Sequence, residues 1–405
     1  MKVKQIANCS LCGSNQLTTY LDFGSHPLAN DLKTAPNEKT DEYPLRVAKC
    51  AVCYCFQLLD IVNPKILFKN YNYESPKNME EHFKEYAQKN VKTFGLDDTD
   101  LVVEIGSNTG LLLKQYSNLG LATLGVEPAK NIAKLAAQNQ VDTICDFFTP
   151  EVATKIRKST GPAALICANN VLCHTSLKPI IDGIKILLDK DGYLVQENAY
   201  WPKTLEMNDL GQIYSEHQTY ATITSLSTFY AKNGFKLFDV EFNNMHNGSF
   251  RAYIKWANNK KMKFKDVVLD TINKESDSGI FNKEYYNDFM RRLNNTKDYI
   301  LEKLRVIKGN KQRIGLYGYP AKIFLPLRFF GLDTLLDFAV DDSALKLHKY
   351  IPGTAIQIKS REEFLSNPPD YMIIGAANYA EDIIKKNQKV KTQWITILPS
   401  FKLID

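Results

Sequence analysis

Apolar runs separated by polar turns recur through the middle of the chain with the spacing of alternating strands and helices. The clearest unit begins at Leu101, where four apolar residues interrupted only by Glu104 predict a buried parallel strand. Gly106 and Gly110 then bracket a polar turn, and three leucines starting at Leu111 open a helix. We expect the rest of the chain to be organised around this strand–turn–helix unit.

The same alternation continues beyond this unit. Apolar runs predict six more strands, at 121–126, 141–144, 164–168, 193–198, 236–242 and 250–256. Helical patterns accompany them at 78–92, 131–138, 177–188 and 224–233. Seven strands with interleaved helices predict an α/β domain built on a mostly parallel sheet with a reversed hairpin at one edge.

The C-terminal third has a different pattern. Residues 259–308 are rich in lysine, glutamate and asparagine, and their helical periodicity predicts two exposed helices that bridge domains. Residues 314–322 then repeat the strand–turn–helix pattern, and further strands are expected at 334–340 and 371–374, as in a second, smaller Rossmann-like unit. The chain therefore divides into three expected domains, at residues 1–75, 76–258 and 259–405.

The composition is that of an ordinary globular protein. Of 405 residues, 44% are hydrophobic and 24% are charged, so disorder is not indicated. A net charge of +6 on scattered lysines does not predict a nucleic-acid partner, although it suits an anionic small-molecule substrate. There is no signal peptide and no run of about 18 apolar residues. We therefore expect no membrane partner, a cytoplasmic location, and a monomer or weak homo-oligomer.

Eight cysteines in a reducing compartment favour metal ligation or simple burial over disulfides. Two Cys-x-x-Cys pairs, Cys9/Cys12 and Cys50/Cys53, predict a zinc site with four thiolate ligands. Four ligands leave no open coordination position, so we assign this zinc to folding and not to catalysis. Cys55 is close enough to Cys53 to compete as a ligand. Burial of the thiols without a metal is the alternative, but it would not produce the paired spacing twice.

The turn after the first central strand has the features of a nucleoside site without a pyrophosphate. The spacing Gly106-x-x-x-Gly110 is not that of a dinucleotide site, because Asn108 replaces the second glycine of that motif. Glu127 closes the second strand, where a carboxylate is placed to bind a ribose diol. These residues, with Glu104, predict S-adenosylmethionine as the cofactor. The alternative is a packing turn in another α/β sheet.

The ends of the third and fourth strands add to this expected cofactor site. Asp146 and Phe147 form a plausible adenine clamp, in which the carboxylate accepts the exocyclic amine and the ring stacks, although taken alone they would be core residues. Asn169 ends the fourth strand, at the sheet edge where ligands bind.

Two further groups of polar residues are candidates for chemistry. Tyr214, Glu216 and His217 bring a phenol, a carboxylate and an imidazole together, which can support proton abstraction. For a lone histidine, a solvated loop would be the simpler interpretation. Ser249 and Arg251 lie in the predicted hairpin, where an arginine beside Gly-Ser is suited to bind a phosphate bidentately; a surface turn is the alternative.

With these residues assembled, the chain resembles the sugar C-methyltransferases of deoxysugar biosynthesis, in particular the nucleotide-linked 3-C-methyltransferases that act on 4-keto-hexoses. The resemblance covers essentially the whole length. Its markers are Tyr71-x-Tyr73-x-Ser75, Glu104-x-Gly106-Ser-Asn-Thr-Gly110, Asp146-Phe147-Phe148, Asn169-Asn170-Val-x-x-His174, Tyr214-x-Glu216-His217 and Gly248-Ser249-x-Arg251. It implies a class I methyltransferase core between a zinc module and a C-terminal Rossmann-like domain.

The resemblance also implies roles. His217 would be the base that removes a proton from the carbon next to a ketone, and the enolate carbon would then attack the methyl group of S-adenosylmethionine. Tyr214, Tyr73 and His174 would surround the reacting carbons and include the donors to the enolate. Glu216 would orient His217 or hold a sugar hydroxyl. An imidazole with an unperturbed pKa near ~6.5 would be neutral enough to accept the proton.

The C-terminal turn Tyr317-Gly-x-x-Ala-Lys322 resembles the family turn that closes over the nucleotide-sugar, with Tyr317 and Lys322 as substrate ligands. The chain departs from the family after it. Ile323 stands where a polar residue is usual, and the stretch from Asp341 to His348 lacks the usual proline and glycine. These departures keep a methyltransferase for a non-sugar or unactivated acceptor as an alternative. A non-catalytic zinc-knuckle scaffold is the least favoured hypothesis.

Overall fold

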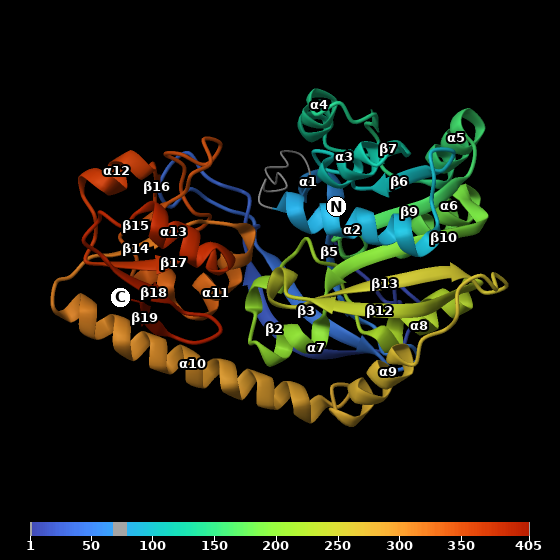
Figure 1. Cartoon of the computed structure of the whole chain (residues 1–405). Coiled ribbons are helices and arrows are strands. Elements are labelled where there is room, and N and C mark those ends of the chain that lie inside the picture. Colours follow the sequence, from blue (N-terminus) through green and yellow to red (C-terminus); the bar gives the residue numbers. More distant parts are fainter. Residues whose placement is uncertain (1, 68–78, 405) are drawn as a thin grey trace.

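A computed structural model of the chain describes residues 2–67 and 79–404. Its largest sheet has seven strands in the order β12-β13-β10-β9-β6-β7-β8 (Figure 1). The strands are β6 (Leu101–Ile105), β7 (Ala122–Val126), β8 (Thr143–Ile144), β9 (Ala163–Asn169), β10 (Leu188–Ala199), β12 (Phe235–Asn243) and β13 (Ser249–Trp256). All neighbours pair in parallel except β13, which is antiparallel to both β10 and β12. The predicted sheet with its reversed hairpin edge is confirmed.

Helices cover both faces of this sheet. One face packs against α2 (Glu80–Phe94) and α3 (Leu111–Asn118). The other packs against α5 (Pro150–Thr160), α6 (Leu177–Leu187) and α8 (Ile223–Lys232). A further helix, α4 (Lys130–Gln138), connects β7 to β8. The strand order reverses between β6 and β9, and a ligand site is expected beyond the carboxyl ends of the strands at such a point.

The N-terminal part forms a second sheet that includes a strand from the central part. Its order is β11-β4-β3-β2. The strands are β2 (Leu17–His26), β3 (Tyr43–Cys50), β4 (Phe56–Leu58) and β11 (Thr219–Tyr220). A separate pair joins β1 (Val3–Gln5) to β5 (Asp60–Val62), which α1 (Pro64–Leu67) follows. The domain boundary expected at residue 75, and Tyr73, lie outside the described residues.

The C-terminal part begins with two helices, α9 (Val267–Asp277) and α10 (Lys283–Gly309). A six-stranded sheet follows, in the order β16-β15-β14-β17-β18-β19. Its strands are β14 (Ile314–Tyr317), β15 (Phe338–Val340), β16 (Ile358–Lys359), β17 (Tyr371–Ile374), β18 (Gln393–Thr396) and β19 (Lys402–Ile404). The strand expected at 334–340 is shorter, because Leu332–Thr334 forms a 3₁₀ turn. The helices α11 (Phe324–Phe329), α12 (Arg361–Ser366) and α13 (Ala380–Lys386) complete this unit.

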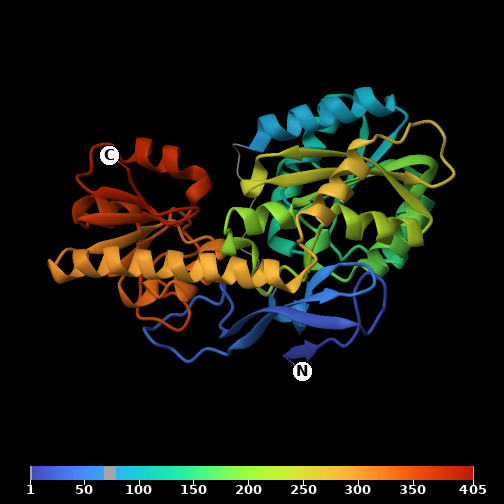
Figure 2. The ribbon, with the colours of Figure 1, turned by 90° about the horizontal axis from the view of Figure 1, so that it is seen from below.

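The long helix α10 runs beneath the C-terminal sheet and toward the central part (Figures 1 and 2). It is exposed on one side, as predicted, but its other side buries Tyr286, Phe289 and Ile300 in a hydrophobic cluster that all three parts share. Within the described residues, no helix is long and apolar enough to cross a membrane.

Candidate active site and zinc centre

The four predicted metal ligands come together in the N-terminal part. The thiol sulfurs of Cys9, Cys12, Cys50 and Cys53 all lie within 4.8 Å of one another. The Cys9–Cys53 and Cys12–Cys50 pairs are 3.5 Å and 3.6 Å apart. A tetrahedral zinc site with bonds of about 2.3 Å needs sulfurs about 3.8 Å apart, so the cluster fits the ion. Cys55 is not in this group, and its thiol faces the Phe56 carbonyl oxygen at 3.4 Å.

A cavity of about 1070 Å³ lies at the carboxyl edge of the central sheet. Residues from all three parts line it, for example Asn30 from the N-terminal part, Glu104 from the central part and Lys322 from the C-terminal part. Single-ligand pockets measure about 300–1,000 Å³, so this cavity has room for a cofactor and a second ligand together.

Glu104 stands at one end of the cavity in the middle of the buried sheet. One of its carboxylate oxygens accepts a hydrogen bond from Asn169 at 3.2 Å. The other has no hydrogen-bond partner among the described residues. Burial, with a smaller contribution from the nearby Glu127 carboxylate, raises the pKa of Glu104 to about 8. A buried carboxylate with an unsatisfied oxygen suits a cationic ligand, and S-adenosylmethionine carries two positive charges, on its sulfonium and ammonium groups.

The turn between β6 and α3 is tight for reasons of packing. Gly106 has φ +66°, and a Cβ atom there would lie 2.4 Å from Val171. Gly110 has φ +80°, and a Cβ atom there would lie 2.7 Å from Val141. Gly106 lines the cavity, whereas Gly110 does not, so the structure assigns Gly110 to the turn and not to cofactor contact. Asn108 also lines the cavity.

Glu127 follows β7 and lines the cavity, and its contact with a ribose stays a prediction. Its carboxylate oxygens accept the backbone N–H groups of Asn108 and Ala129, at 3.1 Å and 2.9 Å, which fixes it at the cavity wall. Burial raises its pKa. Phe147 lines the cavity with half of its side chain exposed, as a stacking ring requires. Asp146 does not line the cavity, because its carboxylate turns back to accept the Phe147 N–H at 2.8 Å.

His217 also lines the cavity, from the loop before β11. Its Nδ1 donates to the Gln212 carbonyl oxygen at 2.8 Å, and its Nε2 is 3.0 Å from the Tyr214 hydroxyl. A carbonyl oxygen only accepts, so Nδ1 carries the proton and Nε2 carries the lone pair. Burial lowers the pKa of His217 well below its ordinary value, and His174 lowers it further. The expectation of an unperturbed imidazole is therefore wrong.

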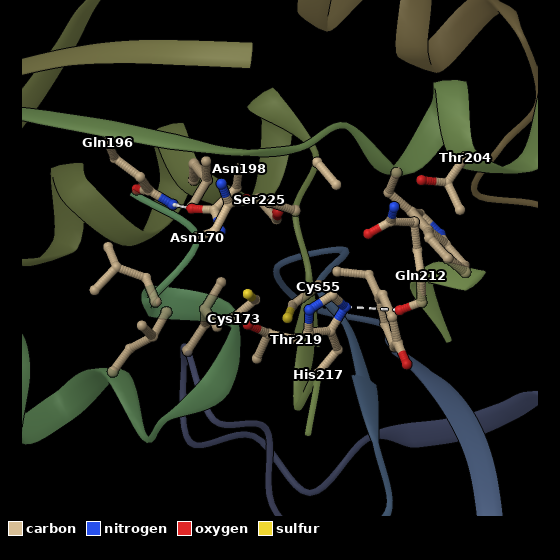
Figure 3. Close-up of a pocket in the computed structure, with 18 residues that line it drawn as sticks. Cys55, Asn170, Cys173, Gln196, Asn198, Thr204, Gln212, His217, Thr219 and Ser225 are labelled. Carbon is tan, nitrogen blue, oxygen red and sulfur yellow. Dashed lines mark hydrogen bonds between the residues drawn. The ribbon is translucent and has the colours of Figure 1, made fainter. Parts of the chain in front are cut away.

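The His174 ring meets the His217 ring edge to face, with ring centroids 4.7 Å apart. His174 ends the 3₁₀ turn Leu172–His174 after β9, and burial lowers its pKa to about 4. His217 also borders a second, much smaller cavity of about 30 Å³ (Figure 3). That space holds about one water.

Glu216 points toward the N-terminal part. Its Oε1 accepts a hydrogen bond from the side chain of Asn30 at 2.8 Å, and burial raises its pKa to about 7. The expected orienting contact with His217 is therefore made by the Gln212 carbonyl oxygen, because the Glu216 carboxylate is engaged by Asn30. Glu216 lines the cavity, so its expected contact with substrate stays open to test.

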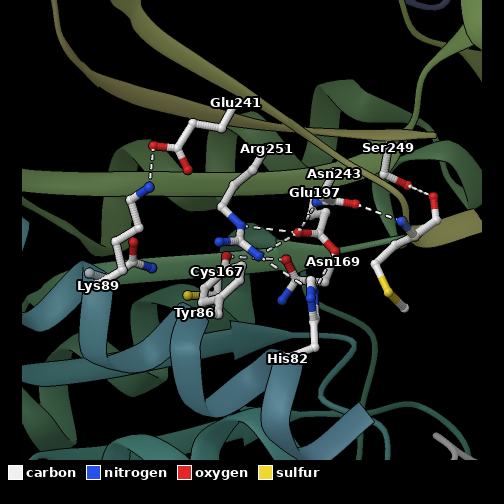
Figure 4. A network of polar contacts seen from close by, with 12 residues as sticks. His82, Tyr86, Lys89, Cys167, Asn169, Glu197, Glu241, Asn243, Ser249 and Arg251 are labelled. Atoms are coloured by element: carbon white, nitrogen blue, oxygen red, sulfur yellow. Dashed lines mark hydrogen bonds and ion pairs between the residues drawn. The ribbon is translucent and has the colours of Figure 1, made fainter.

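The structure corrects the expected roles of Ser249 and Arg251. The Arg251 guanidinium forms a buried ion pair with Glu197, with a closest distance of 2.7 Å, and lies over the ring of Tyr86 (Figure 4). His82 contacts the same carboxylate at 3.1 Å. Arg251 is therefore already neutralised, and it does not line the cavity. Ser249 is fully buried and donates to the Met245 carbonyl oxygen at 2.8 Å.

The two residues expected to bind substrate from the C-terminal turn lie in different surroundings. Tyr317 is buried in the core of the C-terminal sheet and donates to Asp342 at 3.1 Å, so it is not available to a ligand in the cavity. Lys322, in the 3₁₀ turn Ala321–Ile323, does line the cavity. Its ammonium group lies 2.8 Å from Nδ1 of His246, which belongs to the β12–β13 hairpin.

Sequence reasoning missed two residues that help to form the site. Asn30 follows Gly24 and Pro27 in a loop, and nothing in the sequence links it to Glu216. His246 follows a strand and precedes Gly248-Ser249, so the hairpin pattern located it correctly but gave no sign of its contact with Lys322.

Comparison with known proteins agrees with this architecture. Residues 9–68 match the model of a zinc binding domain, residues 79–240 a methyltransferase domain, and residues 244–399 a C-methyltransferase C-terminal domain. The seven-stranded sheet and the cavity beyond its strand ends define a class I methyltransferase that uses S-adenosylmethionine.

The chain is also 30% identical, over 393 residues, to the C-methyltransferase NovU of Streptomyces niveus. That match covers 96% of this chain and 93% of NovU. The protein therefore belongs to the C-methyltransferase family and is an S-adenosylmethionine-dependent enzyme with an N-terminal zinc module.

Solved structures resemble the chain more distantly. A methyltransferase from Clostridium acetobutylicum is 11% identical, with coverage of 47% of this chain and 95% of its own and a TM-score of 0.36. The magnesium protoporphyrin IX methyltransferase of Synechocystis is 13% identical, with coverage of 47% and 90% and a TM-score of 0.34.

Proposed function

We propose that the protein methylates C3 of a nucleotide-activated 4-keto-deoxysugar. The observation that carries the proposal is that His217 and Tyr214, which contact each other, line the same cavity as Glu104 and Glu127. A base and a cofactor site that share one cavity are what carbon methylation next to a ketone requires. The sequence resemblance to the nucleotide-linked 3-C-methyltransferases supports the choice of substrate.

In this proposal, His217 performs the proton transfer. The C–H bond next to the ketone breaks, the proton moves to Nε2, and the negative charge passes to the carbonyl oxygen as the enolate forms. The Gln212 carbonyl oxygen then stabilises the imidazolium through the Nδ1–H bond. Tyr214 must turn its hydroxyl away from Nε2 first, which frees it as a hydrogen-bond donor for the substrate.

The cofactor end supplies the other reactant. Glu104 and Glu127 would hold S-adenosylmethionine, which when bound supplies an electrophilic methyl group. Phe147 covers the adjacent wall and would stack on the adenine, as the sequence predicts. The apolar lining near Val126 and Leu112 excludes water from this end.

The experiment is an assay with labelled S-adenosylmethionine and a panel of UDP-, GDP- and dTDP-linked 4-keto sugars. We expect label on carbon in one of them, together with exchange of the C3 proton for solvent deuterium. Transfer to oxygen alone, or to no sugar, would contradict the proposal.

A second candidate is methylation of a non-sugar or unactivated acceptor. It is favoured by the altered stretch Asp341–His348, in which Lys346 lines the cavity but is ion-paired to Asp341 at 2.9 Å. The same assay with ketone acceptors that lack a nucleotide separates the two candidates.

A further inference from the structure

Lys322 is a cation on the cavity wall without an anionic partner. Among residues 2–67 and 79–404, no carboxylate oxygen lies within 4 Å of its ammonium group, although 18 other ion pairs occur in these ranges. Burial lowers the pKa of Lys322, and the charge of Asp209 opposes that shift, but the Asp209 oxygens accept hydrogen bonds from Gly211, Gln212 and Asn247 and not from the lysine. A charge withdrawn from water is costly unless it is paired, so this position calls for an anionic ligand.

The turn that carries His246 is built to hold this lysine. His246 has φ 52° and ψ 39°, and Asn247 has φ 62°, so two non-glycine residues in a row adopt the left-handed conformation. Such strain persists only where neighbouring contacts impose it, and it is typical of functional sites. The contacts are the Asn247–Asp209 hydrogen bond at 3.0 Å and the Ser249–Met245 bond described above.

Lys322 is also packed against the residues that orient the base. A Cβ atom on Gly211 would lie 2.9 Å from the Lys322 carbonyl oxygen and 3.1 Å from its Cβ. The next residue, Gln212, supplies the carbonyl oxygen that fixes Nδ1 of His217. The pKa values of His217 and His174 are lowered mainly by burial, and the charge of Lys322 lowers both further. The cation therefore acts at the place where the proton is abstracted.

We propose that Lys322 is a catalytic residue whose ammonium group, positioned by His246, donates to the ketone oxygen of the substrate and stabilises the enolate oxygen as His217 removes the neighbouring proton. The inference rests on the proposed function. A charged donor outweighs the neutral donors Tyr214 and His174, because a hydrogen bond from a cation to an oxyanion is about twice as strong as a neutral one.

This role also answers a difficulty with the base. A weakly basic His217 makes proton abstraction unfavourable, because the imidazolium that forms is unstable in its surroundings. A cation that lies closer to the developing oxyanion than to the imidazole lowers the free energy of the enolate by more than it raises that of the imidazolium. The net effect of Lys322 is then to favour the reaction.

The test compares Lys322→Met with Lys385→Met. Lys385 is an exposed lysine on α13 that does not line the cavity. The deciding measurement is the rate of C3 deuterium exchange at saturating keto sugar. We expect the exchange rate of Lys322→Met to fall roughly 10²–10³-fold, as for removal of one oxyanion donor. Lys385→Met should exchange at a rate near that of the wild type.

A second variant and a second measurement complete the test. His246→Ala keeps the ammonium group but not its position, so the exchange rate should fall while the affinity for the nucleoside diphosphate of the active sugar stays unchanged. If Lys322→Met exchanges as fast as the wild type, the inference is wrong: lost diphosphate affinity would then assign the lysine to phosphate, and retained affinity would make it a packing residue. If the wild type exchanges no keto sugar, the proposed function fails and this inference with it.

Discussion

His217 combines a fixed tautomer with a low basicity. The Gln212 carbonyl oxygen directs the Nε2 lone pair toward Tyr214 and the cavity, while burial beside His174 keeps the ring neutral. At neutral pH nearly every molecule is therefore ready to accept a proton, but the reaction must stabilise the products of that transfer elsewhere. At the scale of single residues, the proposed catalysis depends on pairs such as His217 and Lys322, and not on one tuned pKa.

The first prediction concerns His217→Asn. Loss of a general base typically lowers the rate by roughly 10²–10⁴-fold, and we expect deuterium exchange and methyl transfer to fall together by that amount. Binding of S-adenosylmethionine should be unchanged, because the His217 ring contacts Gln212, Tyr214 and His174 and not the proposed cofactor ligands. The control is His348→Asn, an exposed histidine in the C-terminal part. If a folded His217→Asn variant exchanges the proton next to the ketone at the wild-type rate, His217 is not the base.

The second prediction concerns the proton on Glu104. With its pKa raised to about 8, this carboxyl is mostly protonated at pH 7 in the free enzyme. A bound cation favours the ionised form and lowers the pKa, so binding of S-adenosylmethionine should release up to about one proton at pH 7. Calorimetry in buffers of different ionisation enthalpy measures this number.

Glu104→Gln should release no proton and bind the cofactor more weakly, whereas Glu81→Gln, at an exposed position on α2, should behave as the wild type. Because binding lowers the pKa of Glu104, the pH dependence of proton release also follows. Release should diminish above pH 8, where Glu104 is already ionised before the ligand binds. Proton uptake at pH 7 would contradict the assignment.

At the scale of residues, the sequence located most residues of the candidate site but not the contacts between their side chains. His174, Glu127 and His217 follow strands or lie in a marked motif, so the sequence could place them at the carboxyl edge. Arg251 was misassigned because its partner, Glu197, is opposite it in the register of β10 and β13, and register between distant strands is not visible in a single sequence. The contact of Lys322 with His246 joins residues 76 positions apart.

At the scale of elements, a strand of only two residues matters most to the site. Thr219 and Tyr220 form β11, which pairs with β4 of the N-terminal sheet. The Gln218 carbonyl oxygen accepts from Leu58 N–H at 2.9 Å, and the Gln218 N–H donates to the Cys173 carbonyl oxygen. The His217 loop is thus held between the zinc module and the end of β9. A two-residue strand has no hydrophobic period, which is why the sequence did not predict it.

The third prediction follows from this link. Gln57 in β4 accepts hydrogen bonds from the N–H and hydroxyl of Ser10, inside the first zinc knuckle, at 2.8 Å and 3.0 Å. Gln57→Leu leaves that N–H unsatisfied, at a cost of about 1–3 kcal/mol. We expect a lower melting temperature and a lower kcat, with the affinity for S-adenosylmethionine retained. Gln16→Leu, exposed in the same module, is the control. An unchanged kcat would show that β4 does not hold the His217 loop in its active position.

The turn at residues 341–348 explains why the fold could be predicted although this stretch lacks the usual proline and glycine. His348 takes the place of the usual glycine and has φ +61°, so the backbone keeps the left-handed conformation that glycine favours. Lys346 bonds to Asp341 and to the Tyr319 carbonyl oxygen, which holds the turn without the proline. The fold was predictable because the hydrophobic periods of strands and helices are local features of the sequence. The missing proline and glycine affect only the backbone strain of one turn.

At the scale of the whole molecule, the three parts share one hydrophobic core. It includes Phe56 from the N-terminal sheet, Trp201 and Ile213 from the central part, and Phe289 from α10. Trp201 also donates to the Tyr286 hydroxyl at 3.0 Å, which ties α7 (Trp201–Glu206) to α10. Parts that bury side chains in a shared cluster stabilise one another, so disorder in one part should lower the stability of the others.

The last prediction is the effect of removing zinc. The four thiolates close its coordination sphere, so the ion takes no part in the chemistry, yet β4 begins three residues after Cys53 and pairs with the strand that follows His217. We therefore expect a chelator to abolish both proton exchange and methyl transfer by releasing the His217 loop. Cobalt in place of zinc should restore both to nearly the wild-type rate, because it accepts the same tetrahedral thiolate ligands.

Hydrogen exchange at the backbone amides separates this mechanism from a catalytic metal. In the zinc-free protein, the Leu58 amide, which donates to Gln218, and the amides of β11 should lose protection, whereas those of β6 and β7 at the cofactor end should keep it. The free energy of zinc binding is free energy of folding, so the melting temperature of the whole chain should also fall. If activity disappears while the β4 and β11 amides stay protected, or if cobalt changes the rate of the chemical step, the metal acts on the substrate and not through the fold.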